Sequence, residues 1–106
     1  TVACGISGSE RQEIYDFNPD LVLLCGGTDG GNKEVIIANA KHLVAIDRPF
    51  TTIVAGNKSA NDDIKAIFNE AGKDVVITEN VMPQFNKLNI EPARDAIRQL
   101  LISRII

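Results

Sequence analysis

The amino-acid sequence predicts an α/β fold: a small open parallel sheet of about four strands with helices on both faces, built from Rossmann-like βα repeats. First, short β-branched and apolar runs alternate with helical patterns, as in right-handed βαβ units. Second, residues 21–25 (LVLLC) are apolar throughout, which is typical of a central strand covered on both faces. Third, 106 residues, 44% of them hydrophobic, suffice for one core. We therefore expect residues 1–106 to form a single α/β domain and, because the chain begins at Thr1 rather than Met, one excised from a longer protein.

The first half of the chain predicts two strands, each followed by a helix. A weak strand over residues 1–5 is followed by a helix with Ser9 as its N-cap, in a capping-box pattern. Ile14 and Phe17 share one face of that helix, which stops before Pro19 because the residue before proline disfavours the α conformation. After the strand at residues 21–25, a helix over about residues 33–46 has an apolar face that comprises Ile36, Ala40, Leu43 and Val44.

The second half repeats the alternation. A strand at residues 51–55 precedes a helix with Ser59 as its N-cap and Gly72 as its stop signal, and a strand at residues 74–78 follows. The apolar stripe of that helix comprises Ala60, Ile64, Ile67, Phe68 and Ala71. A long connection, residues 79–90, leads to a last helix whose apolar stripe comprises Ala93, Ala96, Ile97, Leu100 and Leu101.

The composition excludes several classes of function. Eleven Lys and Arg against 14 Asp and Glu give a net charge of −3, which argues against a strongly basic nucleic-acid binder. No apolar run approaches the roughly 20 residues that span a bilayer, and the first residues lack a charged region followed by a long apolar stretch, so we expect neither a signal peptide nor a membrane partner. Cys4 and Cys25 lie in apolar runs, as free thiols do in a reducing compartment, and a cytoplasmic location fits best.

The candidate site lies at the carboxyl ends of the predicted strands, where open parallel sheets bind ligands. Polar segments follow three of the strands, at residues 26–33, 56–59 and 79–80, and we expect them to share one rim. The candidate ligand-binding residues are Gly26, Gly27, Thr28, Asp29, Gly30, Gly31, Asn32, Lys33, Asn57, Glu79 and Asn80.

The segment GGTDGGN (residues 26–32) has two interpretations. Its backbone N–H groups could cradle an anion at a helix N-terminus, with Lys33 adding positive charge. Alternatively, its glycines permit positive φ in a tight turn, with Thr28, Asp29 or Asn32 capping the helix. The segment matches neither GxGxxG nor GxxxxGK[ST], so it does not by itself indicate a nucleotide site.

The connection over residues 79–90 is about twice the usual loop length. Its apolar side chains Met82, Phe85 and Leu88 either pack beneath the loop or face a partner, and they are the candidate interface residues. Elsewhere the sequence has no Ser/His/Asp or Cys/His arrangement, no HExxH and no metal-ligand spacing. It therefore predicts neither a catalytic residue nor a metal site.

The motifs LLCGGTDGGNKEVIIANA, GNKSANDDI and ITENVMPQFNKLNIEPARDAI carry a resemblance that covers nearly the whole chain. Over them the sequence resembles the MutL-type accessory proteins of adenosylcobalamin-dependent glutamate mutase, which are unrelated to the mismatch-repair protein of similar name. Cys25 departs from the pattern, which has a smaller residue such as Ala there, and this touches core packing only. The resemblance implies a segment of a larger actin/Hsp70-like ATPase, a reactivating factor that uses ATP to help release damaged cobalamin.

The chain lacks the Asp-Gly-Ser-Thr-type phosphate loop of that superfamily. The resemblance therefore implies an internal domain that is not catalytic in isolation and holds no cofactor, with ATP and Mg²⁺ belonging to the parent protein. The implied partners are the remainder of the parent chain and glutamate mutase, through residues 79–90. Two alternatives stay open: a self-sufficient binding module for a small anionic metabolite or nucleotide, which uses the glycine-rich turn, and a structural insert that spaces the ATPase lobes.

Overall fold

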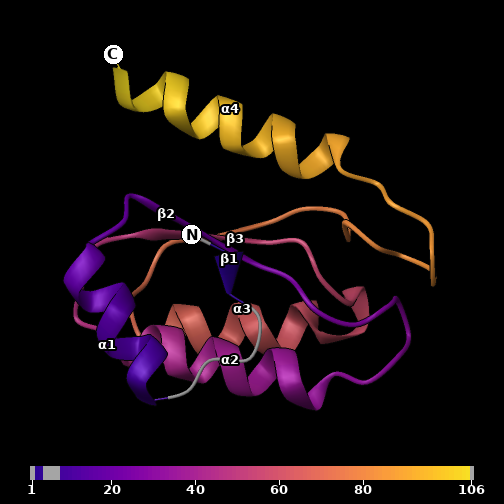
Figure 1. Ribbon diagram of the computed structural model, residues 1–106, viewed down its shortest axis with the longest axis horizontal. Helices are drawn as coiled ribbons and strands as arrows, with labels where there is room; N and C mark the ends of the chain where they lie inside the picture. The colour runs from indigo at the N-terminus through magenta and orange to yellow at the C-terminus, as the bar shows by residue number, and fades with distance from the viewer. Residues whose placement is uncertain (1, 4–7, 106) are drawn as a thin grey trace.

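The sheet is parallel and follows the order of the chain. The computed structural model describes residues 2–3 and 8–105, and in them four strands form one sheet (Figure 1). The strands are β1 (Val2–Ala3), β2 (Leu21–Leu24), β3 (Thr51–Val54) and β4 (Val75–Ile77), which lie side by side in that sequence. Leu23 of β2 lies opposite Ile53 of β3, which lies opposite Val76 of β4. The predicted α/β class and the interior position of the second strand are confirmed.

The helices are divided unequally between the two faces of the sheet. Figure 1 shows α1 (Gly8–Phe17), α2 (Glu34–Val44) and α3 (Asn61–Glu70) on one face and α4 (Glu91–Ile105) on the other. Helices α1, α2 and α3 each connect one strand to the next strand in the sheet. The three connections run across the sheet in the same direction, from β1 toward β4. Because such crossovers are right-handed, all three helices must lie on the same face. The prediction of helices on both faces is confirmed.

The main core lies between the sheet and helices α1 to α3. Side chains alternate across a strand, so Val22 and Leu24 of β2 point into this core and both are fully buried. The other members of the core are Ile14, Ile36, Ala40, Leu43, Ile46, Phe50, Val54, Ala60, Ile64 and Phe68. Leu21 and Leu23 belong to the opposite face, where they are only half-buried. One face of β2 is therefore covered more completely than the other.

Helix α1 differs from the prediction in two respects. It begins at Gly8, so Ser9 lies inside its first turn instead of ahead of it. Ile14 is buried, but the side chain of Phe17 is 74% exposed. Residues three positions apart are separated by only about 60° around the helix, so both lie on one side of α1. Phe17, at the last helical position, is nevertheless not covered by the core that buries Ile14. The side of the helix predicted to be apolar is therefore buried at Ile14 but exposed at Phe17.

The start of α3 also differs. A short 3₁₀ helix, η1 (Lys58–Ala60), precedes it, and the side chain of Asn57 accepts a hydrogen bond from the N–H of Ser59. The capping role predicted for Ser59 therefore belongs to Asn57. At the other end, Gly72 has φ of 67° and the N–H of Lys73 reaches back to the carbonyl of Phe68 at 3.0 Å, which confirms the predicted stop.

The strand ends are shorter than predicted by about one residue. Cys25 follows β2 and is half-buried, whereas Cys4 and the rest of the predicted first strand beyond Val2–Ala3 lie outside the described residues. Among the helices that the structure describes, none is both long enough and apolar enough to cross a membrane.

The core assignment predicts opposite outcomes for two phenylalanines. Phe68→Ala removes a side chain that is 1% exposed and should lower the free energy of unfolding by about 3–5 kcal/mol. Phe17→Ala removes a largely exposed ring and should change that free energy by less than about 0.5 kcal/mol. Urea denaturation of the two variants measures both values, and similar losses would contradict the assignment.

Candidate functional site

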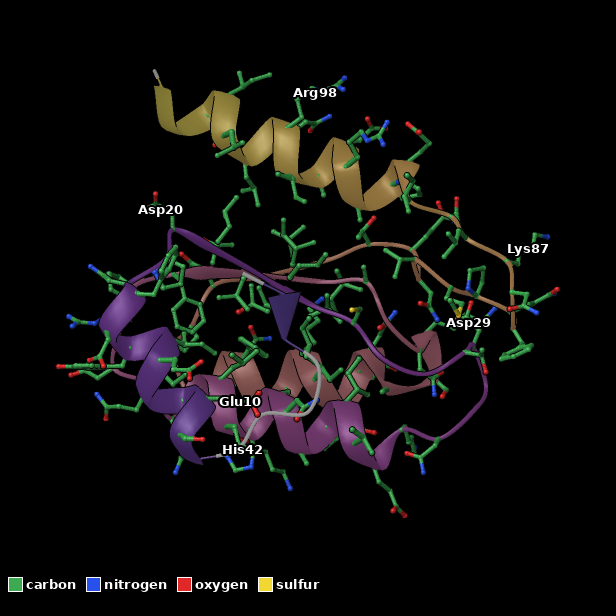
Figure 2. The ribbon with its side chains drawn as sticks, in the orientation of Figure 1. Glu10, Asp20, Asp29, His42, Lys87 and Arg98 are labelled. Carbon is green, nitrogen blue, oxygen red and sulfur yellow. The ribbon has the colours of Figure 1, made fainter. Side chains whose placement is uncertain are left out.

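The three predicted polar segments meet at the carboxyl edge of the sheet. They belong to the glycine-rich loop (residues 25–33), the turn that leads into η1 (residues 55–57) and the long loop (residues 78–90). The N–H of Asn57 donates to the carbonyl of Gly26, and the N–H of Asp29 donates to the carbonyl of Pro83, both at 3.0 Å. Figure 2 shows Asp29 and Lys87 at this end of the sheet and Asp20, which precedes β2, at the other. The segments share one rim, as expected.

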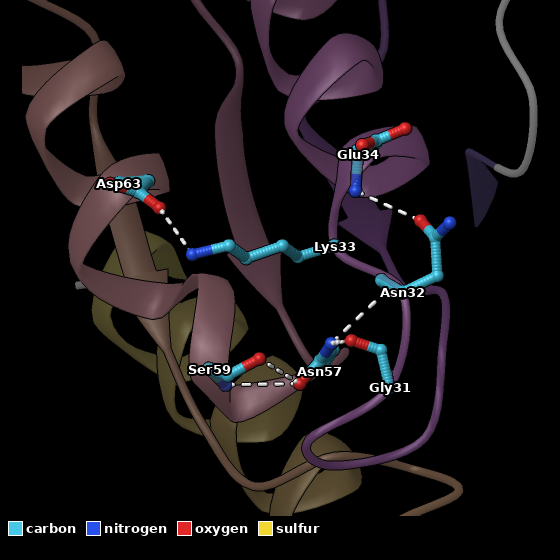
Figure 3. Close-up of polar contacts among 7 residues, drawn as sticks. All are labelled: Gly31, Asn32, Lys33, Glu34, Asn57, Ser59 and Asp63. Carbon is cyan, nitrogen blue, oxygen red and sulfur yellow. Dashed lines mark hydrogen bonds and ion pairs between the residues drawn. The ribbon is translucent and has the colours of Figure 1, made fainter.

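The side chain of Asn57 joins two of these segments. It is fully buried, and its Oδ1 accepts hydrogen bonds from the N–H of Gly30 at 3.0 Å and from Ser59. Its Nδ2 donates to the carbonyls of Gly31 at 2.9 Å and Asn32 at 3.1 Å (Figure 3). One amide therefore pairs three backbone groups in the second half of the glycine-rich loop and caps η1 as well.

Asn80 makes the second connection. It is 3% exposed, and its Nδ2 donates to the carbonyl of Gly27 at 2.9 Å and to Asp29 Oδ1 at 3.1 Å. Its Oδ1 accepts from the N–H of Met82 at 3.0 Å, and Asp29 Oδ1 also accepts from the N–H of Lys58 at 2.9 Å. The long loop is thus tied to the glycine-rich loop by a buried amide, and the glycine-rich loop to η1 by a carboxylate.

Three glycines of the loop, Gly26, Gly27 and Gly30, have a positive φ that favours glycine. Gly27 has φ of 75° and Gly30 has φ of 78°, as the tight-turn interpretation predicts. A Cβ atom on Gly27 would also lie 2.9 Å from the carbonyl oxygen of Asn32, whereas one on Gly30 would meet open space. Gly27 is therefore constrained by both backbone conformation and close packing.

Several polar groups of the glycine-rich loop already have partners within the chain, among them the N–H groups of Asp29, Gly30 and Gly31. Asn32 Oδ1 accepts from the N–H groups of Glu34 at 2.9 Å and Val35 at 3.4 Å, so it caps α2. The N–H of Gly31 donates to the carbonyl of Thr28, while those of Asp29 and Gly30 have the partners given above. This geometry is that of the turn-and-cap interpretation. Binding of an anion by these N–H groups stays a prediction, and it would require some of these bonds to be exchanged.

Lys33 does not extend over the loop. Its Nζ lies 3.6 Å from a carboxylate oxygen of Asp63 on α3, and both side chains are about half exposed (Figure 3). The positive charge assigned to the glycine-rich turn is therefore directed toward α3. An exposed pair of this kind contributes little to stability.

An open cleft of about 440 Å³ lies beside the network. Its lining includes the predicted residues Asp29, Glu79 and Asn80, and also Lys58, Asn61, Ile77, Thr78, Pro83 and Asn89. The sequence analysis did not single out these six as site residues. In the sequence these six residues share only their position beyond the end of β3 or at and beyond the end of β4. That position does not by itself show that they line one cleft. Within the described part of the chain, no group of three His, Cys, Asp or Glu residues is arranged to hold a metal ion.

The long loop presents its apolar side chains to solvent. Residues 84–87 form a tight turn in which the N–H of Lys87 donates to the carbonyl of Gln84 at 3.0 Å and Asn86 has φ of 62°. Exposed fractions are 82% for Phe85, 69% for Leu88 and 36% for Met82. The interpretation in which these side chains pack beneath the loop is therefore wrong.

The glycine geometry predicts a graded series. Gly27→Ala should lower the free energy of unfolding by about 2–3 kcal/mol, because the alanine would have positive φ and meet the Asn32 carbonyl. Gly30→Ala should lower it by about 1–2 kcal/mol, from conformation alone. Gly8→Ala, at an open position without positive φ, is the control and should cost nothing. Equal losses at Gly27 and Gly8 in urea denaturation would contradict the tight turn.

The buried amide predicts a second contrast. Asn57→Ala should lower the free energy of unfolding by about 2–4 kcal/mol, because it leaves backbone groups of two loops without partners. Ser59→Ala removes one hydrogen bond to the same amide and should lower it by about 1 kcal/mol or less. Chemical denaturation of the two variants measures the difference. Losses of equal size would mean that Asn57 does not hold the loops.

Comparison with known proteins agrees with the motifs. The MutL protein family matches over residues 1–106, the whole chain. Protein MutL of Clostridium tetanomorphum is 48% identical over 101 residues, which are 95% of this chain and 22% of that relative. The chain thus spans about a fifth of the length of the relative it matches. The search of solved structures found no match. On the family match and the identity to this relative, the chain belongs to the MutL protein family.

Proposed function

We propose that the chain is a non-catalytic domain of a glutamate mutase accessory protein and that it presents the tip of its long loop to the mutase. Family membership supports the first part of the proposal. The observation that carries the second part is the phenylalanine at the turn, whose ring is 82% exposed. On this proposal, use of ATP belongs to other parts of the parent polypeptide.

The energy available at this tip is on the scale of an interface anchor. Full burial of a phenylalanine side chain contributes about 1.5–3 kcal/mol, and the ring of Phe85 has most of its surface available for such burial. Residues that contribute this much are the ones that dominate protein–protein interfaces. Leu88 lies beside the turn and would add to the same contact.

The base of the loop is held in place before any partner binds. Asn80 ties it to the glycine-rich loop, and the N–H of Asn89 closes it by donating to the carbonyl of Val81 at 2.7 Å. A loop ordered in advance loses less conformational entropy on binding. The network at the carboxyl edge would then serve to position Phe85, which accounts for its hydrogen-bonding groups being used within the chain.

The proposal predicts a loss of function without a loss of stability. Phe85→Ser in the full-length accessory protein should weaken its binding to glutamate mutase by about tenfold or more, because roughly 1.4 kcal/mol of lost contact suffices for that factor. Reactivation of the mutase should fall in parallel. The free energy of unfolding should stay within about 0.5 kcal/mol of the parent value.

Phe17→Ser is the matched control. Phe17 is also a largely exposed phenylalanine, but it lies just before β2, at the amino edge of the sheet. Binding of the mutase, measured by calorimetry, should be unaffected by this change. If Phe85→Ser binds as tightly as Phe17→Ser, the loop tip is not the contact surface.

A further inference from the structure

We infer that a helix from another part of the same polypeptide packs beside α4, over β1 and β2, on the face of the sheet opposite α1 to α3. This inference is independent of the function proposed for the loop tip. It rests on the strand order, on a groove beside α4, and on the length of polypeptide outside residues 1–106.

The strand order leaves one face of the sheet without crossover helices. All three crossovers run in one direction and place α1, α2 and α3 on the same face. Among the residues that the structure describes, the opposite face receives only α4, which follows the last strand (Figure 1). Four strands spaced about 4.8 Å apart make a face about 19 Å wide, and a helix with its side chains is about 10–12 Å wide. A single helix therefore covers about half of that face.

The covered half is the one over β3. Helix α4 packs against β3, where Ile53 is 1% exposed. Beside it, on the β2 side, lies an apolar groove of about 270 Å³. The groove is lined by Leu23, Val81, Ile90, Ala93, Arg94 and Ile97. Leu23 of β2 forms the floor of the groove, and Ala93 and Ile97 of α4 lie along one wall. The open side of the groove therefore faces the region over β1 and β2.

The apolar row along α4 becomes more exposed toward the carboxyl end of the helix. Ala93, Ile97 and Leu101 are four residues apart and lie on one row. Ala93 is 4% exposed, Ile97 is half-buried and Leu101 is 47% exposed. Figure 1 shows the carboxyl end of α4 farther from the sheet than its amino end. This row, which is part of the apolar stripe predicted for the helix, is thus buried at one end only.

The strand beneath the groove has the composition of one that is buried on both faces. In β2, Val22 and Leu24 are fully buried against α1 to α3, while Leu21 and Leu23 on the other face are half-buried. Parallel sheets occur almost only with both faces covered. A second helix at the usual 8–10 Å beside α4 would cover these leucines and the exposed row together.

The relative supplies the reason to assign this helix to the same polypeptide. The matched region is 22% of the Clostridium tetanomorphum protein, so most of that protein lies outside it. A segment of the same chain has a high effective concentration at the groove. The groove takes an amphipathic helix with an apolar stripe toward Leu23 and Ile97. Arg94 at its rim is already paired with Glu91 at 3.2 Å and makes no demand for a further charge.

The first test asks whether the row is covered in the full-length protein. Leu101→Cys and Arg98→Cys are made separately, and modification of the α4 peptide by a maleimide is followed by mass spectrometry. Arg98 is exposed and points away from the sheet in Figure 2. We expect the cysteine at position 101 to react about tenfold more slowly than that at 98, with equal rates in urea. Equal rates in the folded protein would overturn the inference.

The second test identifies the occupant. A photo-crosslinking amino acid at position 101 of the full-length protein should join α4 to a peptide of the same molecule outside residues 1–106. A crosslink between two molecules, with protection that depends on protein concentration, would assign the groove to a second copy and overturn the inference. Protection that appears only when glutamate mutase is added would assign the groove to the mutase and also overturn it.

Discussion

The carboxyl edge of this domain depends on one buried amide, that of Asn57. Its side chain is fully buried and pairs with backbone groups of Gly30, Gly31 and Asn32 and with Ser59. Buried polar groups without partners cost about 1–3 kcal/mol each, so these groups and the amide constrain one another strongly. A residue that follows β3 thereby determines the path of a loop that follows β2.

The constraint extends from this amide to the surface. The glycine-rich loop that Asn57 orders presents the carbonyl of Gly27 and the carboxylate of Asp29 to Asn80, and Asn80 in turn orients Met82 at the start of the long loop. Two sets of hydrogen bonds, one around the buried Asn57 and one around the buried Asn80, therefore support the exposed turn at Phe85. Loops positioned in this way by a rigid sheet are where proteins commonly place binding residues. The buried network and the exposed apolar tip are parts of one structural arrangement.

Much of the fold could be predicted from the sequence because its signals are local. The apolar run that contains β2 and the stop at Gly72 reflect the preferences of neighbouring residues. The network could not be predicted, because its bonds join residues 25 to 53 positions apart. Ser59 is as good a capping residue as Asn57, and only the position of the glycine-rich loop favours the asparagine. The sequence indicated that the polar segments meet, but not which groups would pair.

The unequal faces of the sheet follow from its topology. Because every strand pairs with the next one in the same direction, each crossover adds its helix to one face and completes that core. The chain can reach the second face only after its last strand, with the single helix α4. The core beneath α1 to α3 is closed, with most of its side chains less than 5% exposed, whereas Leu21, Leu23 and Leu101 have no comparable cover. A sheet with this strand order that is apolar on both faces therefore needs a covering element from outside its own βα repeats. The relative from Clostridium tetanomorphum extends well beyond this region, and on our inference the covering element comes from the corresponding remainder of the polypeptide.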